Sequence, residues 1–132
     1  MKHKILIFSI FIIALLSVGC NKPNKSLIEG KFKGKFNVTY KSGKQSGKTT
    51  LILQNGKFSC SGNSDRIPAG GSGIYSFDDK TITFSDENIW TADFDWNLIL
   101  NGQYDYQFDG KNLIIYADKN DVGHYEYRLV KQ

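Results

Sequence analysis

Residues 118–123 carry the pattern with the clearest chemical meaning, because Asp-Lys-Asn-Asp-Val-Gly begins like a calcium-binding loop. Such a loop needs an oxygen ligand at its fifth position and a glutamate at its twelfth. Those positions hold Val122 and Leu129, so two of the required ligands are missing. The segment therefore predicts a turn between the last two strands of the chain rather than a metal site.

Four acidic residues, Asp86, Glu87, Asp93 and Asp95, form the other candidate for chemistry. Paired carboxylates can hydrolyse glycosidic bonds when their separation is right, whereas short acidic segments between strands are commonly solvated surface. The chain has two histidines, of which only His124 lies outside the N-terminal leader, and two cysteines. These are too few for a familiar metal site or a histidine-based triad. We therefore expect a non-enzymatic protein with no catalytic residue, no metal and no cofactor.

The N-terminus has the features of a secretory signal peptide. A basic start at residues 2–4 precedes an apolar run over residues 5–16, which is shorter than the roughly 18 residues of a spanning helix. Gly19-Cys20 follows, and it resembles the lipobox of bacterial lipoproteins, with Leu16 one position earlier than in the usual pattern. The resemblance implies that residues 1–19 are removed and that the Cys20 thiol carries diacylglycerol, with further acylation by a fatty acid such as palmitate. The alternative is an ordinary secreted protein with a cysteine at that place.

Residues 20–29 are interpreted as the lipidated cysteine and a polar tether, and residues 30–132 as one domain. In the lipoprotein family, Asn21 rather than Asp after the cysteine implies sorting to the outer membrane of a Gram-negative bacterium, so we expect a lipid-anchored cell-envelope protein. The mature chain has 15 basic and 13 acidic residues, a balance that does not indicate nucleic acid as a partner. We expect a monomer that contacts the membrane through its lipid. With Cys20 acylated, Cys60 is expected to be a buried, inert thiol.

Apolar residues alternate with polar ones along most of the domain, which is typical of half-buried strands. In the first such segment, Phe32, Phe36, Val38 and Tyr40 share one face and lysines dominate the other. The pattern predicts about eight strands, over residues 30–41, 47–54, 57–62, 72–77, 80–86, 96–108, 112–118 and 122–130. In the longest one, Asn101-Gly102 is either a bend, which the alternation favours, or a turn that would make nine strands. A short turn capped by Asp86 is expected before it.

Tight turns at Asn55-Gly56, Asp78-Asp79 and Asp109-Gly110 separate neighbouring strands. An antiparallel meander of this kind predicts an all-β, closed up-and-down barrel, because closure removes exposed sheet edges. The chain resembles the lipocalin-like (calycin-type) barrels found among small bacterial lipoproteins. Gly30-Lys31-Phe32 stands where that family places Gly-x-Trp at the start of its first strand, and Arg128 lies near the family's arginine in the last strand. The resemblance implies that this arginine packs over the first-strand aromatic ring.

Aromatic residues supply the candidate binding sites. An eight-stranded barrel is either filled by its own side chains or able to hold one small ligand, and buried tyrosine hydroxyls need partners. The candidate ligand-binding residues on the inward face are Tyr40, Trp96, Tyr104, Tyr106, Tyr125 and Tyr127. The candidate partner-binding residues, Trp90 and Phe94, lie in a long connection between strands, where they form either a contact surface or a cap over one end of the barrel.

Taken together, these patterns favour a lipid-anchored, non-enzymatic binding protein that takes a small apolar ligand into the barrel interior. The alternative is a protein-interaction module, of inhibitor or immunity type, that uses the loop aromatics. A carboxylate-based hydrolase is the third hypothesis. A ligand carrier should keep a cavity lined by tyrosines, whereas an interaction module should have a filled barrel and an exposed patch around Trp90.

Overall fold

The computed structural model describes residues 28–132, whose regular secondary structure is almost entirely strand. The elements in chain order are β1 (Gly30–Tyr40), β2 (Gly43–Gln54), β3 (Lys57–Cys60), β4 (Gly71–Phe77), β5 (Thr81–Asp86), the 3-10 turn η1 (Trp96–Leu98), β6 (Gly102–Phe108), β7 (Asn112–Lys119) and β8 (Gly123–Lys131). No helix within these residues is long and apolar enough to cross a membrane. The predicted signal peptide, Cys20 and most of the tether lie outside the described residues.

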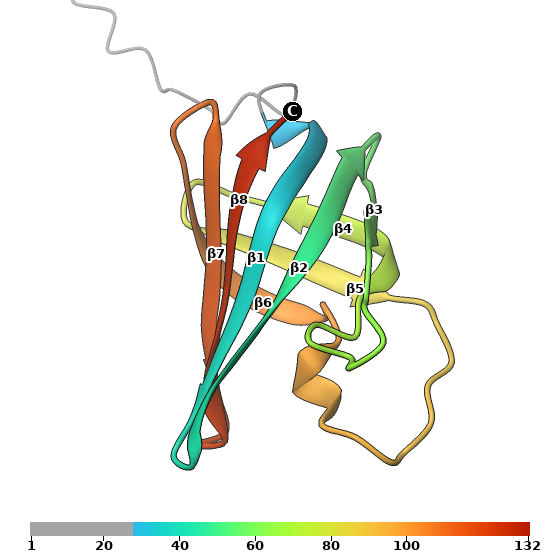
Figure 1. The fold of residues 1–132 in the computed structure, drawn as a ribbon. Helices are drawn as coiled ribbons and strands as arrows, with labels where there is room; N and C mark the ends of the chain where they lie inside the picture. Colours follow the sequence, from blue (N-terminus) through green and yellow to red (C-terminus); the bar gives the residue numbers. More distant parts are fainter. Residues whose placement is uncertain (1–27) are drawn as a thin grey trace, which may run out of the picture.

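The strands form one closed antiparallel barrel, as the sequence predicts. Each strand pairs with the next, and β8 pairs with β1 to close the sheet (Figure 1). This architecture is compatible with a lipocalin-like fold. The arginine contact implied by the resemblance is not formed, because Arg128 points outward and binds Glu126 at 2.5 Å. Phe32 instead packs edge-on against Phe108, with ring centroids 5.8 Å apart.

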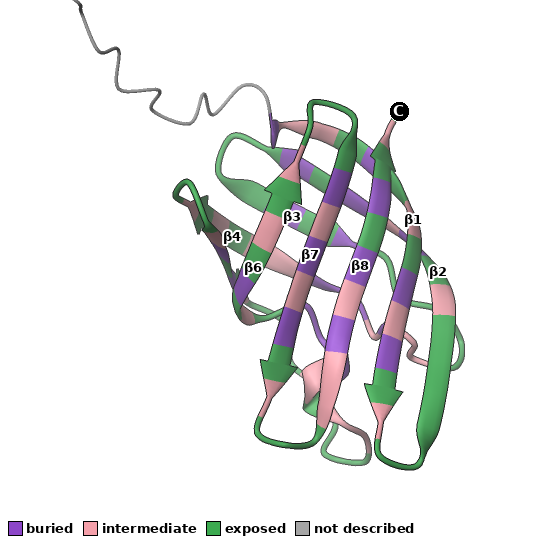
Figure 2. Ribbon diagram, turned by 90° about the vertical axis from the view of Figure 1, so that its left-hand side faces the viewer, coloured by how far each residue is buried: buried purple, intermediate pink, exposed green. Residues whose placement is uncertain are grey.

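The alternation of burial along each strand places the core inside the barrel. Buried and exposed residues succeed each other along β1, β7 and β8 (Figure 2), which matches the period of two in the sequence. Phe32, Phe36 and Val38 of β1 are fully buried between outward-facing lysine and polar residues. Burial of the inward face stabilises the barrel by roughly 25 cal/mol for each Å² of apolar surface removed from water.

The predicted strand over residues 96–108 is wrong in its first half. Trp96–Leu98 form η1, capped by Asp95, whose side chain accepts a hydrogen bond from the Asn97 amide, and β6 begins only at Gly102 with φ +93°. The physical reason is that Leu98, Ile99 and Leu100 are all buried, whereas a strand in a barrel wall buries only every second residue. The expected turn capped by Asp86 is also absent, because the capping aspartate is Asp95.

Strand β2 starts at Gly43, four residues before its predicted beginning at residue 47. Its first residues carry no alternating apolar pattern, yet they continue the ladder with β1 down to the pair Tyr40 and Gly43. The Asn55-Gly56 turn is confirmed, with φ of +52° and +75° at its two central residues. The calcium-like segment forms the β7–β8 turn, where Asn120 and Asp121 take positive φ values of 49° and 54°.

Candidate functional site

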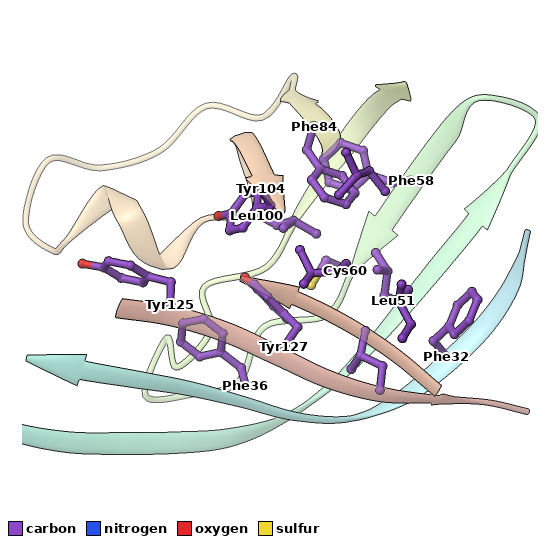
Figure 3. Close-up of a cluster of buried hydrophobic side chains, with 14 of the residues drawn as sticks. Phe32, Phe36, Leu51, Phe58, Cys60, Phe84, Leu100, Tyr104, Tyr125 and Tyr127 are labelled. Atoms are coloured by element: carbon purple, nitrogen blue, oxygen red, sulfur yellow. The ribbon is translucent and has the colours of Figure 1, made fainter. Parts of the chain in front are cut away.

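The barrel interior is filled by its own side chains. Figure 3 shows the aromatic and aliphatic residues that meet there, with Tyr127 between Phe36 and Tyr104. The ring centroid of Tyr127 lies 4.7 Å from that of Phe36 and 6.2 Å from that of Tyr104. Cavities of about 450 and 480 Å³ among the described residues are lined by outward-facing side chains, as around Lys33 and around Asp118. A smaller one, of about 320 Å³, lies beside the β2–β3 turn and is lined by Glu29, Tyr75 and Phe77. The geometry is that of a packed core.

Two of the candidate tyrosines share one carboxylate at the end of the barrel that η1 covers. Tyr40 and Tyr125 donate hydrogen bonds to Oδ2 of Asp95 at 2.8 and 2.7 Å. Burial opposes ionisation of Asp95, but the hydrogen bonds from Tyr125, the Asn97 amide and Tyr40 outweigh it, so the pKa of this carboxyl is lowered. Burial, reinforced by the Asp95 charge, raises the pKa of Tyr40 to about 12. The arrangement ties the η1 segment to β1 and β8.

Lys119 satisfies the hydroxyl of Tyr104 beside this cluster. Its Nζ donates to Tyr104 Oη and to the carbonyl oxygen of Asn101, both at 2.8 Å, and lies 4.3 Å from the centre of the Tyr104 ring. Burial lowers the pKa of Lys119 to about 8, although the Asp95 charge opposes this shift. No sequence motif marks Lys119 as a functional residue. The only signal was a lysine at the very end of a strand, where a long side chain can fold back over the barrel mouth.

The remaining candidates of the proposed interior site are separated from one another. Tyr127 is fully buried, and within the described residues its hydroxyl has no hydrogen-bond partner. Tyr106 is only partly buried, and its hydroxyl donates to the carbonyl oxygen of Asp78 while its ring packs edge-on against Phe77. The placement of Trp96 inside the barrel is wrong, because 56% of its surface is exposed and its Nε1 donates to the Thr91 carbonyl at 2.9 Å. Trp96 belongs to η1, so it does not follow the alternation of β6.

The long connection between β5 and β6 carries an exposed apolar surface, which we call the loop surface and define as Ile89, Trp90, Phe94 and Trp96. Ile89 is 100% exposed, and Trp90 and Phe94 are partly buried against each other with ring centroids 5.9 Å apart. Trp90 and Phe94 were expected in a contact surface, whereas Trp96 was expected inside the barrel and Ile89 was given no role. The available signal was an apolar residue inside the acidic stretch over residues 86–95, Ile89, and another directly after it, Trp96.

Specific polar contacts hold this loop in place. Trp90 Nε1 donates to Asp86 Oδ2 at 2.6 Å. Arg66, from the connection between β3 and β4, lies 4.5 Å above the Phe94 ring and binds Asp93 at 3.0 Å. The two long connections are therefore fastened to each other across the barrel end. These contacts hold the backbone of the loop surface against the neighbouring connection.

The three aspartates among the four acidic residues have separate partners. Asp86 accepts from Trp90 and from the Ser72 amide, Asp93 binds Arg66, and Asp95 serves the two tyrosines. His124 binds Asp118 at 2.8 Å on the outer surface. Within residues 28–132 no group of three or more histidine, cysteine or acidic side chains lies together as metal ligands would.

Cys60 is buried inside the barrel, as expected from its place on the strand face. The thiol is 6% exposed and lies 3.3 Å from Thr49 Oγ1. Burial raises its pKa to about 11, with a smaller opposing effect from the Thr49 hydroxyl. A protonated, buried thiol of this kind is a core side chain and a poor nucleophile.

Comparisons of the chain with protein-family models, with curated proteins and with solved structures gave no significant match. The interpretation of the site therefore depends on its own geometry.

Proposed function

We propose that this protein is a lipid-anchored, non-enzymatic interaction module that presents the loop surface to a protein partner in the cell envelope. The observation that carries the proposal is the contrast between a filled barrel and an exposed, well-supported apolar loop. The hydroxyl groups of Tyr40, Tyr104 and Tyr125 form hydrogen bonds within the protein, with Asp95 and Lys119. A carrier of apolar ligands would keep such groups and the space between them for the ligand.

The loop surface has the composition of a binding hot spot. Tryptophan is enriched among residues whose truncation costs at least about 2 kcal/mol of binding energy, and Trp96 leaves more than half of its surface in water. Ile89, in the same connection, adds a fully exposed apolar side chain. Because Arg66 and Asp86 already hold the loop in place, binding of a partner would cost little conformational entropy in this loop.

Site-specific photocrosslinking in the intact envelope tests this proposal. A photoreactive residue at position 89 should trap one defined partner, which mass spectrometry identifies, and Trp96→Ala should abolish the adduct. The matched control places the same photoreactive residue at Thr83, an exposed position in the middle of β5. Equal adducts at positions 83 and 89, or no adduct at either, would contradict an interaction through the loop surface.

The lipid anchor is tested separately. Cys20→Ala should stop incorporation of labelled fatty acid and release the protein from the membrane fraction. The basic start, the apolar run over residues 5–16 and Gly19-Cys20 motivate this expectation. Identical fractionation of wild type and variant, with no label in either, would remove the anchor from the proposal.

The ligand-carrier alternative keeps one supporting observation, the buried Tyr127 hydroxyl without a partner among the described residues. If a ligand fills this need, purified protein should take up an apolar fluorescent probe, and Tyr127→Phe should weaken that uptake. A filled barrel predicts no saturable uptake by the wild type.

A further inference from the structure

Charge is strongly segregated in this domain. The hairpin of β1 and β2, residues 30–54, contains six lysines and no acidic residue, whereas residues 55–132 carry an excess of acidic side chains. The outward positions of β1 include Lys31, Lys33 and Lys35, and those of β2 include Lys44 and Lys48. The outer face of this hairpin is therefore a positively charged side of a barrel whose other strands and loops are net acidic.

Three cations on this face stand directly beside one another. In the strand register Lys35 lies opposite Lys48 on β2 and opposite Arg128 on β8. Arg128 is neutralised by Glu126 at 2.5 Å, but within residues 28–132 neither Lys35, Lys48 nor the neighbouring Lys33 forms an ion pair. Like charges opposite each other across strands are destabilising. A bound anion would reduce the repulsion among these cations.

The surface is hollowed at the same place. A groove of about 450 Å³ lies between Lys33 and Lys35 of β1, Lys48 and Thr50 of β2, and Ser61 just after β3. The Ser61 hydroxyl oxygen accepts a hydrogen bond from the Thr50 amide at 2.8 Å, which leaves its own proton free to point into the groove. The side chains that line this hollow include three lysines and one serine hydroxyl, and charged ammonium and hydroxyl donors are the groups that bind a phosphate.

We propose that this basic groove binds the phosphate of an anionic phospholipid headgroup and so seats the outer face of the β1–β2 hairpin on the membrane. The proposal rests on the lipid anchor of the proposed function. Ile28 follows Cys20 by eight residue steps, and a fully extended chain of that length spans at most about 29 Å. The tether leads into β1, whose outward lysines line the groove, so an anchor at Cys20 keeps this face close to the bilayer.

The topology gives this orientation a consequence for the partner site. In the closed strand order β5 is four strands away from β1 in either direction, so it lies across the barrel. The connection that carries Ile89 and Trp90 follows β5 directly, at the right-hand side of the view in Figure 1. A barrel seated on the hairpin of β1 and β2 would therefore direct this part of the loop surface away from the lipid, whereas Trp96 stays beside Asp95, which binds Tyr40 of β1 and Tyr125 of β8.

The expected effect is large enough to measure. A lysine held near an anionic membrane surface contributes about fivefold to the binding constant, so three together contribute roughly 100-fold. This attraction falls within a Debye length of about 10 Å at 0.1 M salt, so high salt should abolish it. Substitution by glutamine removes mutual repulsion among the three lysines, so the variants are expected to fold.

The test compares lysine reactivity on two membranes. The full-length chain, extracted from membranes in detergent, is reconstituted in nanodiscs of phosphatidylcholine alone or mixed equally with phosphatidylglycerol, and acetylation of each lysine is followed by mass spectrometry. Lys33, Lys35 and Lys48 should react at least about fivefold more slowly in the anionic discs, while Lys80, in the turn after β4, should not change. K33Q/K35Q/K48Q should lose sedimentation with phosphatidylglycerol vesicles, and the matched K57Q/K80Q/K111Q variant should keep it.

Equal acetylation in the two kinds of nanodisc would overturn the proposal. Protection by inorganic phosphate in detergent that equals the protection in anionic discs would assign the groove to free phosphate instead. A chain that enters neither kind of disc lacks the anchor. Sedimentation of the same protein with phosphatidylglycerol vesicles then shows whether the groove binds anionic lipid, and no sedimentation would overturn the proposal. None of these results depends on crosslinking at Ile89, so the groove and the partner surface can fail independently.

Discussion

Removing the hydroxyl of Tyr127 should make the protein more stable. The side chain is 0% exposed, and its hydroxyl has no partner within residues 28–132. A buried hydroxyl without a hydrogen bond costs about 1–3 kcal/mol of stability, since it has given up its water and gained nothing in return. Tyr127→Phe keeps the ring contacts with Phe36 and Tyr104 and removes only the unsatisfied oxygen. We expect the free energy of unfolding to rise by about 1–3 kcal/mol.

Tyr125→Phe is the matched control, because the same atom is removed two residues away on the same strand. Its hydroxyl donates to the Asp95 carboxylate at 2.7 Å, and a hydrogen bond to a charged group contributes about 1.5–3 kcal/mol. The control should therefore lose stability by about that amount. Two chemically identical changes on β8 should thus have opposite signs.

Urea denaturation followed by far-ultraviolet circular dichroism measures both changes. Unchanged m-values would show that the comparison concerns stability alone, and each kcal/mol should move the melting temperature by about 4–8 °C in a domain of this size. If Tyr127→Phe instead lowers the free energy of unfolding by about 1 kcal/mol or more, the hydroxyl is bonded in solution, to buried water or to a ligand. That result would refute the argument and strengthen the ligand-carrier alternative.

Three further predictions follow from single contacts. Hydrogen bonds lower the pKa of Asp95 in the folded protein, so the stability that this carboxylate provides is fully present above its ordinary pKa of 3.8 and is lost as the pH falls through the lowered value. In a measurement of unfolding free energy against pH, Asp95→Asn should reduce the loss of stability at acidic pH. The buried thiol of Cys60, with a pKa near 11, should react with a thiol reagent at least about a hundred times faster in denaturant than in buffer, and rapid native labelling would contradict its burial. Gly34→Ala would place a Cβ 1.9 Å from the Arg128 carbonyl oxygen, so thermal unfolding should show a loss of about 3 kcal/mol or more, whereas Ser46→Ala on exposed β2 should change little.

The sequence by itself determined the barrel. Alternation with a period of two, sustained from β1 to β8 and punctuated by turns such as Asn55-Gly56, admits an antiparallel meander and excludes helices. It also placed Cys60 and the buried tyrosines of β8 correctly, since a residue's face in a regular strand follows from its position alone. These features are local, so they can be read without knowing what lies across the barrel.

The tertiary structure alone decided what happens at the barrel end and on its surface. Three successive apolar residues, Leu98 to Leu100, are buried because two connections close over that end, and this removed Trp96 from the wall and made it part of the loop surface. The partners of the tyrosine hydroxyls, Asp95 and Lys119, lie 15 to 55 residues away in sequence. The grouping of Lys35 with Lys48 and Arg128 likewise depends on strand register and barrel closure. Such contacts depend on distances between segments remote in sequence, and no local periodicity encodes those distances.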